Sequence, residues 1–461
     1  MELDPVLLSR IQFAWVIAFH ILLPALTVGL ACYIALLESL WFWTGNPVWF
    51  RISSFWIRIF AVSFGMGVVS GVVMPFQFGT NWSAFTDATA DVIGPLMAYE
   101  VLTAFFLEAG ALGVLLFGRK LAPPWAHVLA ALLIAVGTLA SSFWIIAVNS
   151  WMQTPQGHEI VDGRYFPADW AAVVFSPSLP YRLAHTVTAF LITAGFVVTG
   201  VAAGYLRAGR HREEARRMLS MTFWLLTALA PLQILIGDLH GLNTFEHQPA
   251  KVAAMEGHWE TRAGAPLILF GWPDAAAEAT RFALEAPKLG SLILTHDPDG
   301  VVRGLKDWPP EDRPPVAIVF WAFRIMLGLG FLMLFAVAAA AWLRFRGRLY
   351  DAGWFLRLCQ WLTPAGFIAV LAGWATTEVG RQPWLVYGLM RTAEGVTPSL
   401  RGGDVLASLL IHVAVYAVVY PAGLYHLARI VRTGPPAGEM EPPVEGQQRP
   451  LPGSEPAEQG R

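Results

Sequence analysis

Nine apolar blocks of bilayer-spanning length constrain this chain more than any other feature of its sequence. They cover residues 11–37, 55–78, 95–117, 125–149, 183–206, 218–240, 316–343, 356–380 and 404–431. Each block can cross a hydrocarbon core of about 30 Å at a helical rise of about 1.5 Å per residue. Of the 461 residues 56% are hydrophobic and only 14% are charged, which is more apolar than a soluble domain needs. The sequence therefore predicts an all-α polytopic membrane protein with about nine transmembrane helices.

Cysteine usage and charge exclude several other classes of protein. The only two cysteines, Cys32 and Cys359, both lie in apolar blocks, so neither a disulfide framework nor a CxxC or CxxCH site is possible. No basic stripe with interleaved aromatic residues is present, so nucleic acid is not an expected partner. The start "MELDPVLLSR" lacks a basic leader and a small-residue cleavage site, and we expect the first block to be retained as a helix.

Arginine and lysine concentrate in alternate links between the blocks. The basic residues in these links are Arg119 and Lys120, then Arg207, Arg210, Arg212, Arg216 and Arg217, then Arg344, Arg346, Arg348 and Arg357. The link at 78–94 has neither arginine nor lysine. Because basic loops stay on the cytoplasmic side, the pattern predicts an N-terminus outside and a C-terminus in the cytoplasm. Arg381, Arg391 and Arg401, in the last outer loop, run against this rule.

Two segments outside the apolar blocks complete the predicted organisation. Residues 241–315 are too long for a simple connection and are expected to form a folded, functional outer loop. That loop belongs to a single transmembrane unit over 1–432. Residues 433–461 are rich in Pro, Gly and Glu and are expected to form a disordered cytoplasmic tail.

Ionisable side chains inside apolar blocks mark candidate functional positions, because a charge in the bilayer is costly. The set is His20, Glu38, Glu100, Glu108, His185, Arg324, Glu378 and His412, with Met326 close to Arg324. Counted from the helix ends, His20, Glu100, His185, Met326 and Glu378 all fall in the outer half of the membrane. Structural polar residues would be scattered instead. His412 is interpreted as structural.

The chemistry open to this set centres on a macrocycle. Histidine and methionine together make a low-spin haem site, whereas a single histidine or carboxylate leaves one axial position open. Glu378 and Arg381 share a helix face, with Trp374 one turn earlier, so iron could meet the carboxylate and a propionate the guanidinium. A simple surface ion pair between Glu378 and Arg381 remains an open alternative. For His185 a helix-start hydrogen bond, and for Met326 plain core packing, are the alternatives.

Glu100 and Glu108 form a second candidate feature. They are eight residues apart, which puts them about 80° apart around an α-helix, at two depths. Two carboxylates at successive depths in the membrane are typical of a proton relay. Structural, hydrogen-bonded carboxylates are the alternative interpretation.

Six short stretches resemble those of a known family in the same order along the chain. They are "SRIQFAWVIAFHILLPALTVGLA", "PFQFGTNWS", "YEVLTAFFLEA", "NSWMQTP", "AFRIM" and "EVGRQPW". Together they resemble subunit I of the cytochrome bd-type quinol oxidases, from about residue 5 to 432. The segment "GDLHGLNTFEHQPAKVAAMEGHWET" is similar to the cyanide-insensitive branch, and the outer loop is similar to that of short-loop members.

The resemblance implies three haems and a set of ligands. His185 and Met326 match the axial pair of the low-spin haem b. His20 and Glu378 match the ligands of two high-spin haems, one haem b and one haem d or a further haem b, and which residue serves which haem stays open. Arg324, Trp374 and Arg381 match positions around the haems.

The resemblance also implies an activity and partners. Glu256 and Lys251 match loop residues of quinol oxidation, Glu256 as general base and Lys251 as a contact of the quinol head group. Glu100 and Glu108 match acidic residues of the proton path to the site of oxygen reduction. Quinol would be oxidised outside and O2 reduced to water with protons from inside, which separates charge without pumping.

The implied setting is the bacterial cytoplasmic (inner) membrane. The implied partners are the lipid bilayer, a second membrane subunit (subunit II) and a small single-helix accessory subunit. The alternatives are a non-redox transporter lined by Glu100, Glu108 and Arg324, and a receptor or scaffold. Neither accounts for the His/Met set together with "GRQPW".

Overall fold

The computed structural model describes residues 3–436, so most of the predicted tail, residues 437–461, lies outside the described residues. Within 3–436, nine helical stretches are long and apolar enough to cross a membrane, which confirms the predicted fold class. The helices of these stretches are α1 (Pro5–Thr44), α2 (Pro47–Thr80), α3 (Ser83–Glu100), α4 (Phe106–Phe117), α5 (Pro124–Gln153), α6 (Trp170–Val174), α7 (Leu179–Ala208), α8 (Arg212–His247), α11 (Val316–Phe345), α12 (Gly353–Trp361), α13 (Ala365–Val379) and α14 (Gly402–Thr433).

The remaining elements connect the spanning helices. They are the helices α9 (Pro249–Glu256) and α10 (Leu289–Thr295), and the strands β1 (His158–Val161), β2 (Arg164–Pro167), β3 (Arg262–Ala263), β4 (Leu267–Asp274), β5 (Ala279–Ala286), β6 (Val301–Val302), β7 (Trp384–Val386) and β8 (Met390–Arg391). The strands pair only as four antiparallel two-stranded ribbons within residues 3–436: β1 with β2, β3 with β6, β4 with β5, and β7 with β8.

The first two helices show why the chain turns where it does. The side chains of Asp4 and Asn46 each accept a hydrogen bond from the backbone N–H two residues later, and each precedes a proline at the first helical position. Gly45 ends α1 with φ 63°, a left-handed conformation that suits glycine. Two capped helices thus meet across a two-residue turn and must run antiparallel.

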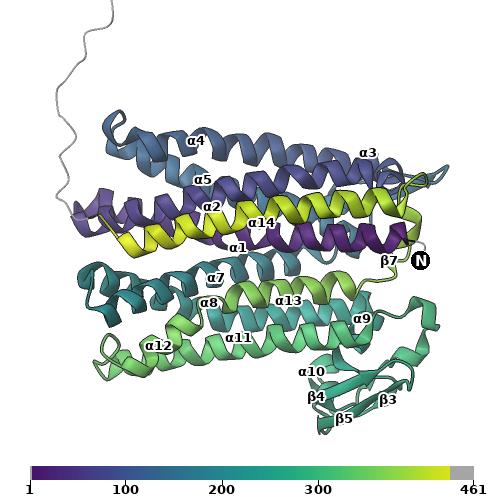
Figure 1. Cartoon of the computed structure of the whole chain (residues 1–461). Coiled ribbons are helices and arrows are strands. Elements are labelled where there is room, and N and C mark those ends of the chain that lie inside the picture. The colour runs from purple at the N-terminus through teal and green to yellow at the C-terminus, as the bar shows by residue number, and fades with distance from the viewer. Residues whose placement is uncertain (1–2, 437–461) are drawn as a thin grey trace, which may run out of the picture.

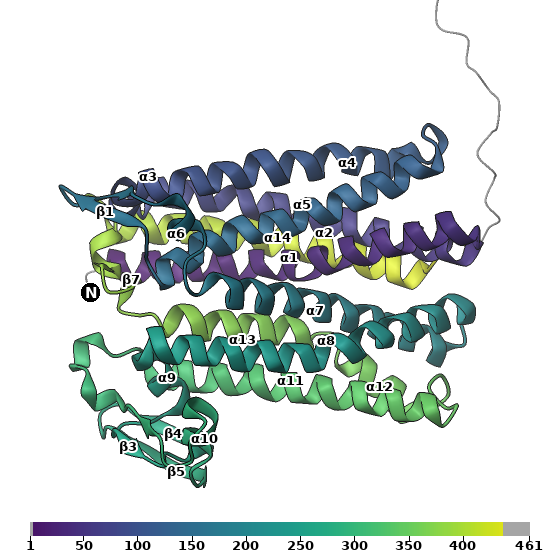
Figure 2. The ribbon, with the colours of Figure 1, turned by 180° about the vertical axis from the view of Figure 1, so that it is seen from behind.

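The helices form one bundle around α1, which packs against α2, α5, α7 and α14 (Figures 1 and 2). The N-terminus, the strands and α9 gather at one end of the bundle, here called the loop end. The links 209–211 and 346–352, where the arginines concentrate, lie at the opposite end, here called the basic end, together with the C-terminal end of α14. The two ends of the described chain therefore lie on opposite sides of the bundle.

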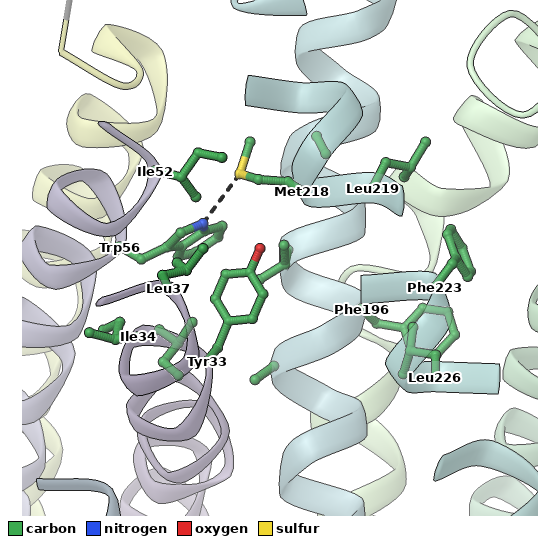
Figure 3. Packing of buried hydrophobic residues seen from close by; sticks show 14 of the residues in the cluster. Tyr33, Ile34, Leu37, Ile52, Trp56, Phe196, Met218, Leu219, Phe223 and Leu226 are labelled. Carbon is green, nitrogen blue, oxygen red and sulfur yellow. Dashed lines mark hydrogen bonds between the residues drawn. The ribbon is translucent and has the colours of Figure 1, made fainter. Parts of the chain in front are cut away.

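The largest buried cluster lies in the half of the bundle near the basic end. Trp56 of α2 is fully buried and donates its indole N–H to the sulfur of Met218 on α8 at 3.3 Å (Figure 3). Tyr33 of α1 packs edge-on against Trp56, and Phe223 lies against Phe355 of α12. Because this half is filled by side chains, open space is left in the half near the loop end.

The structure divides or extends three of the apolar blocks. The block 356–380 contains two helices, because Pro364 cannot donate a backbone hydrogen bond and disfavours helical geometry in the residue before it. The block 95–117 belongs to a longer stretch from Ser83, and a π-helical turn over Val101–Phe105 separates α3 from α4. Helix α8 continues to His247, so the outer segment begins at 248 and not at about 241.

Candidate functional site

One large cavity lies between the helices toward the loop end. It has a volume of about 1610 Å³, larger than the roughly 300–1,000 Å³ of an ordinary small-molecule site, so it has room for more than one large ligand. Of the eleven residues given a haem, quinol or proton role from the resemblance, ten line it: His20, Glu100, Glu108, His185, Lys251, Glu256, Met326, Trp374, Glu378 and Arg381. Arg324 is the exception.

His20 on α1 has a hydrogen-bond partner that suits the form that binds a metal. Its Nδ1 lies 3.0 Å from the Ser70 hydroxyl on α2, and that hydroxyl also lies within reach of the backbone oxygens of Met66 and Gly67. When the hydroxyl donates to one of these oxygens, the Ser70 oxygen can accept from Nδ1–H. In that tautomer Nε2 keeps its lone pair, as a ligating histidine requires.

Glycines on neighbouring helices leave room beside three of the predicted ligands. A Cβ added at Gly71 would lie 3.1 Å from the His20 ring, and one at Gly373 would lie 2.8 Å from the Met326 sulfur. A Cβ at Gly237 would lie 3.4 Å from the His185 ring. The helices therefore pack backbone against ligand side chain and leave the cavity itself free.

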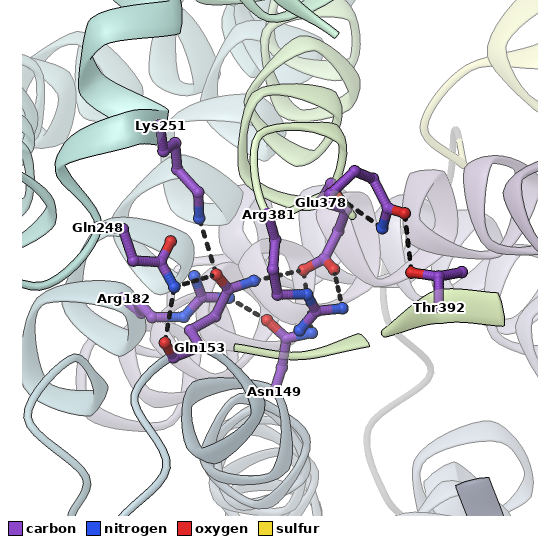
Figure 4. A network of polar contacts seen from close by, with 9 residues as sticks. Asn149, Gln153, Arg182, Gln248, Lys251, Glu378, Arg381 and Thr392 are labelled. Carbon is purple, nitrogen blue, oxygen red and sulfur yellow. Dashed lines mark hydrogen bonds and ion pairs between the residues drawn. The ribbon is translucent and has the colours of Figure 1, made fainter. Parts of the chain in front are cut away.

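Glu378 is the centre of a buried polar network (Figure 4). Arg381 contacts its carboxylate at 2.5 Å, and the amides of Asn149 and Gln153 on α5 each donate to it at 3.1 Å. The side chains of Arg381 and Glu378 are 5% and 16% exposed, so the ion pair exists but is not a surface pair. Nε and Nη1 of Arg381 have no hydrogen-bond partner among residues 3–436. Since buried donors are normally satisfied, these two atoms fit an acidic ligand.

The same network contains two basic side chains besides Arg381. The buried Arg182 on α7 donates to Ser150 at 3.1 Å and also to Asn149, and Lys251 on α9 donates to Gln153 at 2.7 Å. Burial lowers the pKa of Lys251 well below its usual range, and the charge of Arg182 adds to this effect. Two arginines and a lysine therefore surround a single carboxylate, which favours an acidic group such as a haem propionate.

Arg182 and His240 are cavity-lining residues that sequence reasoning missed. Arg182 stands one residue before the apolar block 183–206, so it was not counted as a charge inside the membrane. His240 is the last residue of the block 218–240, and its ring centroid lies 5.4 Å from that of His185. A search over the whole helices α7 and α8 would have included both residues.

Glu256, at the end of α9, is buried and lies 3.9 Å from the Arg324 guanidinium. Its Oε2 has no hydrogen-bond partner among the described residues. Burial raises the pKa of this carboxyl, while the charge of Arg324 opposes the shift. Arg324 itself donates to the backbone oxygens of Met255 at 2.6 Å and Ile268 at 3.1 Å. It therefore joins α11 to α9 and β4 instead of facing the cavity.

Glu100 and Glu108 both face α5. Ser141 donates to Glu100 at 2.7 Å, and a Cβ at Gly137 would lie 2.7 Å from Glu108 Cγ, so the two carboxylates meet one face of α5 a turn apart. An unbroken α-helix would separate them by about 80°, and the extra residue of the π turn reduces this to about 20°. The turn thus brings them into line. Glu38, in contrast, pairs with Arg119 near the basic end, away from the cavity.

In the described part of the chain, nine spanning stretches surround a cavity edged by histidine, methionine and carboxylate, which is typical of a haem-binding membrane protein. The family model of cytochrome bd terminal oxidase subunit I matches residues 8–435. The chain belongs to this family, whose members are oxidoreductases of the respiratory chain.

Relatives and a solved structure agree with this assignment. The chain is 32% identical to cytochrome bd-II ubiquinol oxidase subunit 1 of Escherichia coli (strain K12), over 96% of this chain and 99% of the relative. It is 33% identical to cytochrome bd ubiquinol oxidase subunit 1 of Bacillus subtilis (strain 168), over 94% of each chain. The bd oxidase structure from Geobacillus thermodenitrificans superposes with a TM-score of 0.87 at 33% identity, covering 94% of this chain and 100% of that one.

Proposed function

We propose that this chain oxidises a membrane quinol at the loop end and houses the reduction of O2 to water, with release and uptake of protons on opposite sides of the membrane. The observation that carries the proposal is the single cavity, which brings together the four predicted ligands, the pair Lys251 and Glu256, and the pair Glu100 and Glu108. Family membership supports haem cofactors, a quinol substrate, O2 and a subunit II partner.

His185 and Met326 would hold a low-spin haem b. His20 and Glu378 would hold the two high-spin haems, a haem b and a haem d or further haem b. When bound, these groups would supply the one-electron chemistry and the oxygen chemistry. Arg381 would hold propionates, Arg182 would share that role, and Trp374, which also lines the cavity, would contact a haem.

On the quinol side, Glu256 accepts the hydroxyl proton of the head group. Its raised pKa keeps the carboxylate basic enough to take such a proton, and its free Oε2 leaves an acceptor for it. Lys251 lies on the same short helix α9, five residues earlier, and its amine steadies the oxygen from which the proton leaves. Protons lost there are released at the loop end.

On the oxygen side, Glu108 and Glu100 pass protons along α5 into the cavity. Both line it, at successive turns of one helix face. With the loop end outside and the basic end in the cytoplasm, release and uptake occur on opposite sides and separate charge without a pump. The cytoplasmic membrane of a bacterium is the proposed location, and a single-helix accessory subunit is a proposed further partner.

A visible spectrum and an oxygen electrode test the proposal together. We expect the purified oxidase to show reduced-minus-oxidised haem bands and quinol-dependent oxygen consumption. Glu256→Gln should abolish most consumption with the bands unchanged. Glu260→Gln is the matched control, because its exposed carboxylate in the same loop pairs with Lys306 and not with a cavity residue. A protein without haem bands would refute the redox function, and normal turnover in Glu256→Gln would remove that residue from the quinol site.

A further inference from the structure

The β4–β5 hairpin presents an apolar face that the bundle does not cover. Phe270, Trp272 and Leu284 are 52%, 58% and 60% exposed. Phe270 and Trp272 are two residues apart on β4, and Leu284 of β5 pairs with Phe270, so the three lie on one side of the ribbon. This hairpin face, defined by these three residues, is larger than the single exposed apolar side chains that are normal on a protein surface.

The hairpin face lies beside a spanning helix and not beyond its end. Phe270 and Trp272 pack against Trp321 of α11, with ring centroids at 5.2 and 6.4 Å. Ile318 and Ile325, on the same side of α11 one turn before and one turn after Trp321, are 55% and 46% exposed. Figures 1 and 2 both show β4 and β5 alongside the end of α11. The hairpin face therefore continues the exposed apolar stripe of a helix inside the membrane.

Paired charges lie at the turn end of this face. Arg281 stands opposite Trp272 across the ribbon and pairs with Asp274 at 2.7 Å, and Arg313 pairs with Glu278 at 2.5 Å near the turn of the hairpin. Tryptophan and phenylalanine next to paired charges are typical of segments at the level of lipid head groups. Exposing apolar side chains to water costs about 25 cal/mol per Å² of apolar surface. A surface that faced only water would gain nothing in return for this cost.

We propose that the β4–β5 hairpin lies in the lipid head-group region and inserts this face among the acyl chains of the leaflet at the loop end. Its occupant is lipid, because the face is continuous with the lipid-exposed stripe of α11 and is edged by charge. The hairpin is thus a membrane contact added to the nine spanning stretches of the described chain.

Two side chains join the hairpin to the quinol site: Thr280 of β5 donates to the backbone oxygen of Gly257 at 2.7 Å, and Arg324 of α11 contacts both segments. Its guanidinium donates to Ile268 on β4 and to Met255 on α9, and lies 3.9 Å from Glu256. A hairpin fixed at the membrane surface therefore fixes Glu256 at a set depth. This second step rests on the proposed quinol chemistry of Glu256. In this step the hairpin aligns Glu256 with the head group of a quinol that arrives from the lipid.

Fluorescence quenching in vesicles tests the lipid contact without any turnover. Leu284→Cys is labelled with bimane in a background in which Cys32 and Cys359 are alanine, and the oxidase is placed in dioleoylphosphatidylcholine vesicles. We expect brominated phosphatidylcholine to quench the label and iodide to leave it bright. Glu260→Cys, an exposed position in the same loop, is the control and should show the reverse.

Two outcomes would overturn the proposal. Quenching by iodide alone at position 284 would place the hairpin in water, and quenching by neither agent would show that another protein covers it. An unchanged haem spectrum in the labelled oxidase verifies that the variant is folded.

A second measurement tests the alignment. Phe270→Ser combined with Trp272→Ser should raise KM for a long-chain quinol about threefold to tenfold, because the apolar contact that seats the hairpin is lost, while kcat changes little. An unchanged KM would leave the hairpin without influence on Glu256. A loss of kcat with KM unchanged would contradict the alignment step and indicate damage at Glu256 itself. The quenching experiment does not depend on Glu256, so it would still test the lipid contact.

Discussion

At the scale of single residues, two of the four predicted ligands have hydrogen-bond partners on another helix. The Ser70 hydroxyl lies 3.0 Å from Nδ1 of His20, and Asn149 and Gln153 orient the carboxylate of Glu378. Second partners of this kind usually hold a metal ligand in place and tune its basicity. Substitution of a ligand or of its hydrogen-bond partner is therefore expected to change the haem site.

Loss of either residue proposed to hold the low-spin haem should remove its spectral signal. Met326→Leu keeps the size of the side chain but deletes the sulfur, and His185→Ala deletes the imidazole. We expect the low-spin α-band to disappear from the reduced-minus-oxidised spectrum in both variants. Met218→Leu, another buried methionine that does not line the cavity, is the control and should keep the band. An unchanged band in Met326→Leu would contradict the assignment of the pair.

The raised pKa of Glu256 predicts how quinol oxidation depends on pH. Below that raised pKa the carboxyl is neutral and cannot accept a proton, so kcat/KM for quinol should fall as pH decreases through it. Arg324 faces the carboxyl. Arg324→Gln would remove the positive charge that lowers the pKa of Glu256, so the fall in kcat/KM should move to higher pH. Steady-state oxygen consumption, measured at a series of pH values from mildly acidic to alkaline, gives this pH dependence. A profile that is the same in Glu256→Gln and in the unmodified oxidase would disprove the role.

The sequence located most residues of the site but not their full surroundings. His20, Glu108 and Glu378 stand out because a polar side chain inside an apolar block is visible without a structure. Arg182 was missed because it lies at a block boundary, where charge is ordinary. Arg324 was expected near a haem, and its contacts with two backbone oxygens depend on how the loop folds back, which hydropathy does not encode.

At the scale of elements, the π turn in the third spanning stretch determines where Glu108 points. Its period is longer than that of an α-helix, so a sequence-based estimate of about 80° between Glu100 and Glu108 was bound to differ from the structure. Hydrophobic periodicity located the stretch but could not detect one extra residue. Hydrophobic periodicity also missed the break between α12 and α13, because apolar residues continue through it, although Pro364 is visible in the sequence.

Glu108→Gln should slow oxygen reduction while haem content is retained, because an amide cannot carry a proton. Deletion of Leu102, an exposed residue of the π turn, should leave the reaction intact. The deletion restores a regular helix in which the two carboxylates are seven residues and about 20° apart, so Glu108 still faces Gly137. Single-turnover oxidation of the reduced oxidase, with charge movement followed, measures both variants. Unimpaired kinetics in Glu108→Gln would make Glu108 a structural acid, and slow kinetics in the deletion would show that the alignment depends on the extra residue.

At the scale of the whole molecule, the two ends of the bundle differ in charge and in structure. The arginine-rich links and the end of α14 lie at the basic end, and the folded segments and α9 lie at the loop end. The positive-inside rule then predicts that quinol oxidation takes place on the outer side. Nine apolar blocks were enough to predict this layout from sequence, because length and charge are local properties.

Cysteine labelling of intact cells tests the orientation. A membrane-impermeant maleimide should label Asp299→Cys in the loop at 296–300 and leave Arg348→Cys in the link at 346–352 unlabelled until the cells are opened. Asp299 is exposed at the loop end, so its side chain is within reach of the reagent. The opposite pattern would invert the proposed direction of charge separation.

The crowding of positive charge around Glu378 bears on how the protein is made. Arg182 and Arg381, with Lys251 beside them, are buried at the meeting point of α5, α7, α9 and α13. These three basic side chains share the single carboxylate of Glu378, and uncompensated buried charge costs several kcal/mol, so the helices would repel one another in a newly inserted chain. An acidic cofactor removes that repulsion, and its arrival becomes a step of biogenesis instead of a late addition. Cells short of haem should therefore accumulate an open chain that quality-control proteases in the membrane can degrade.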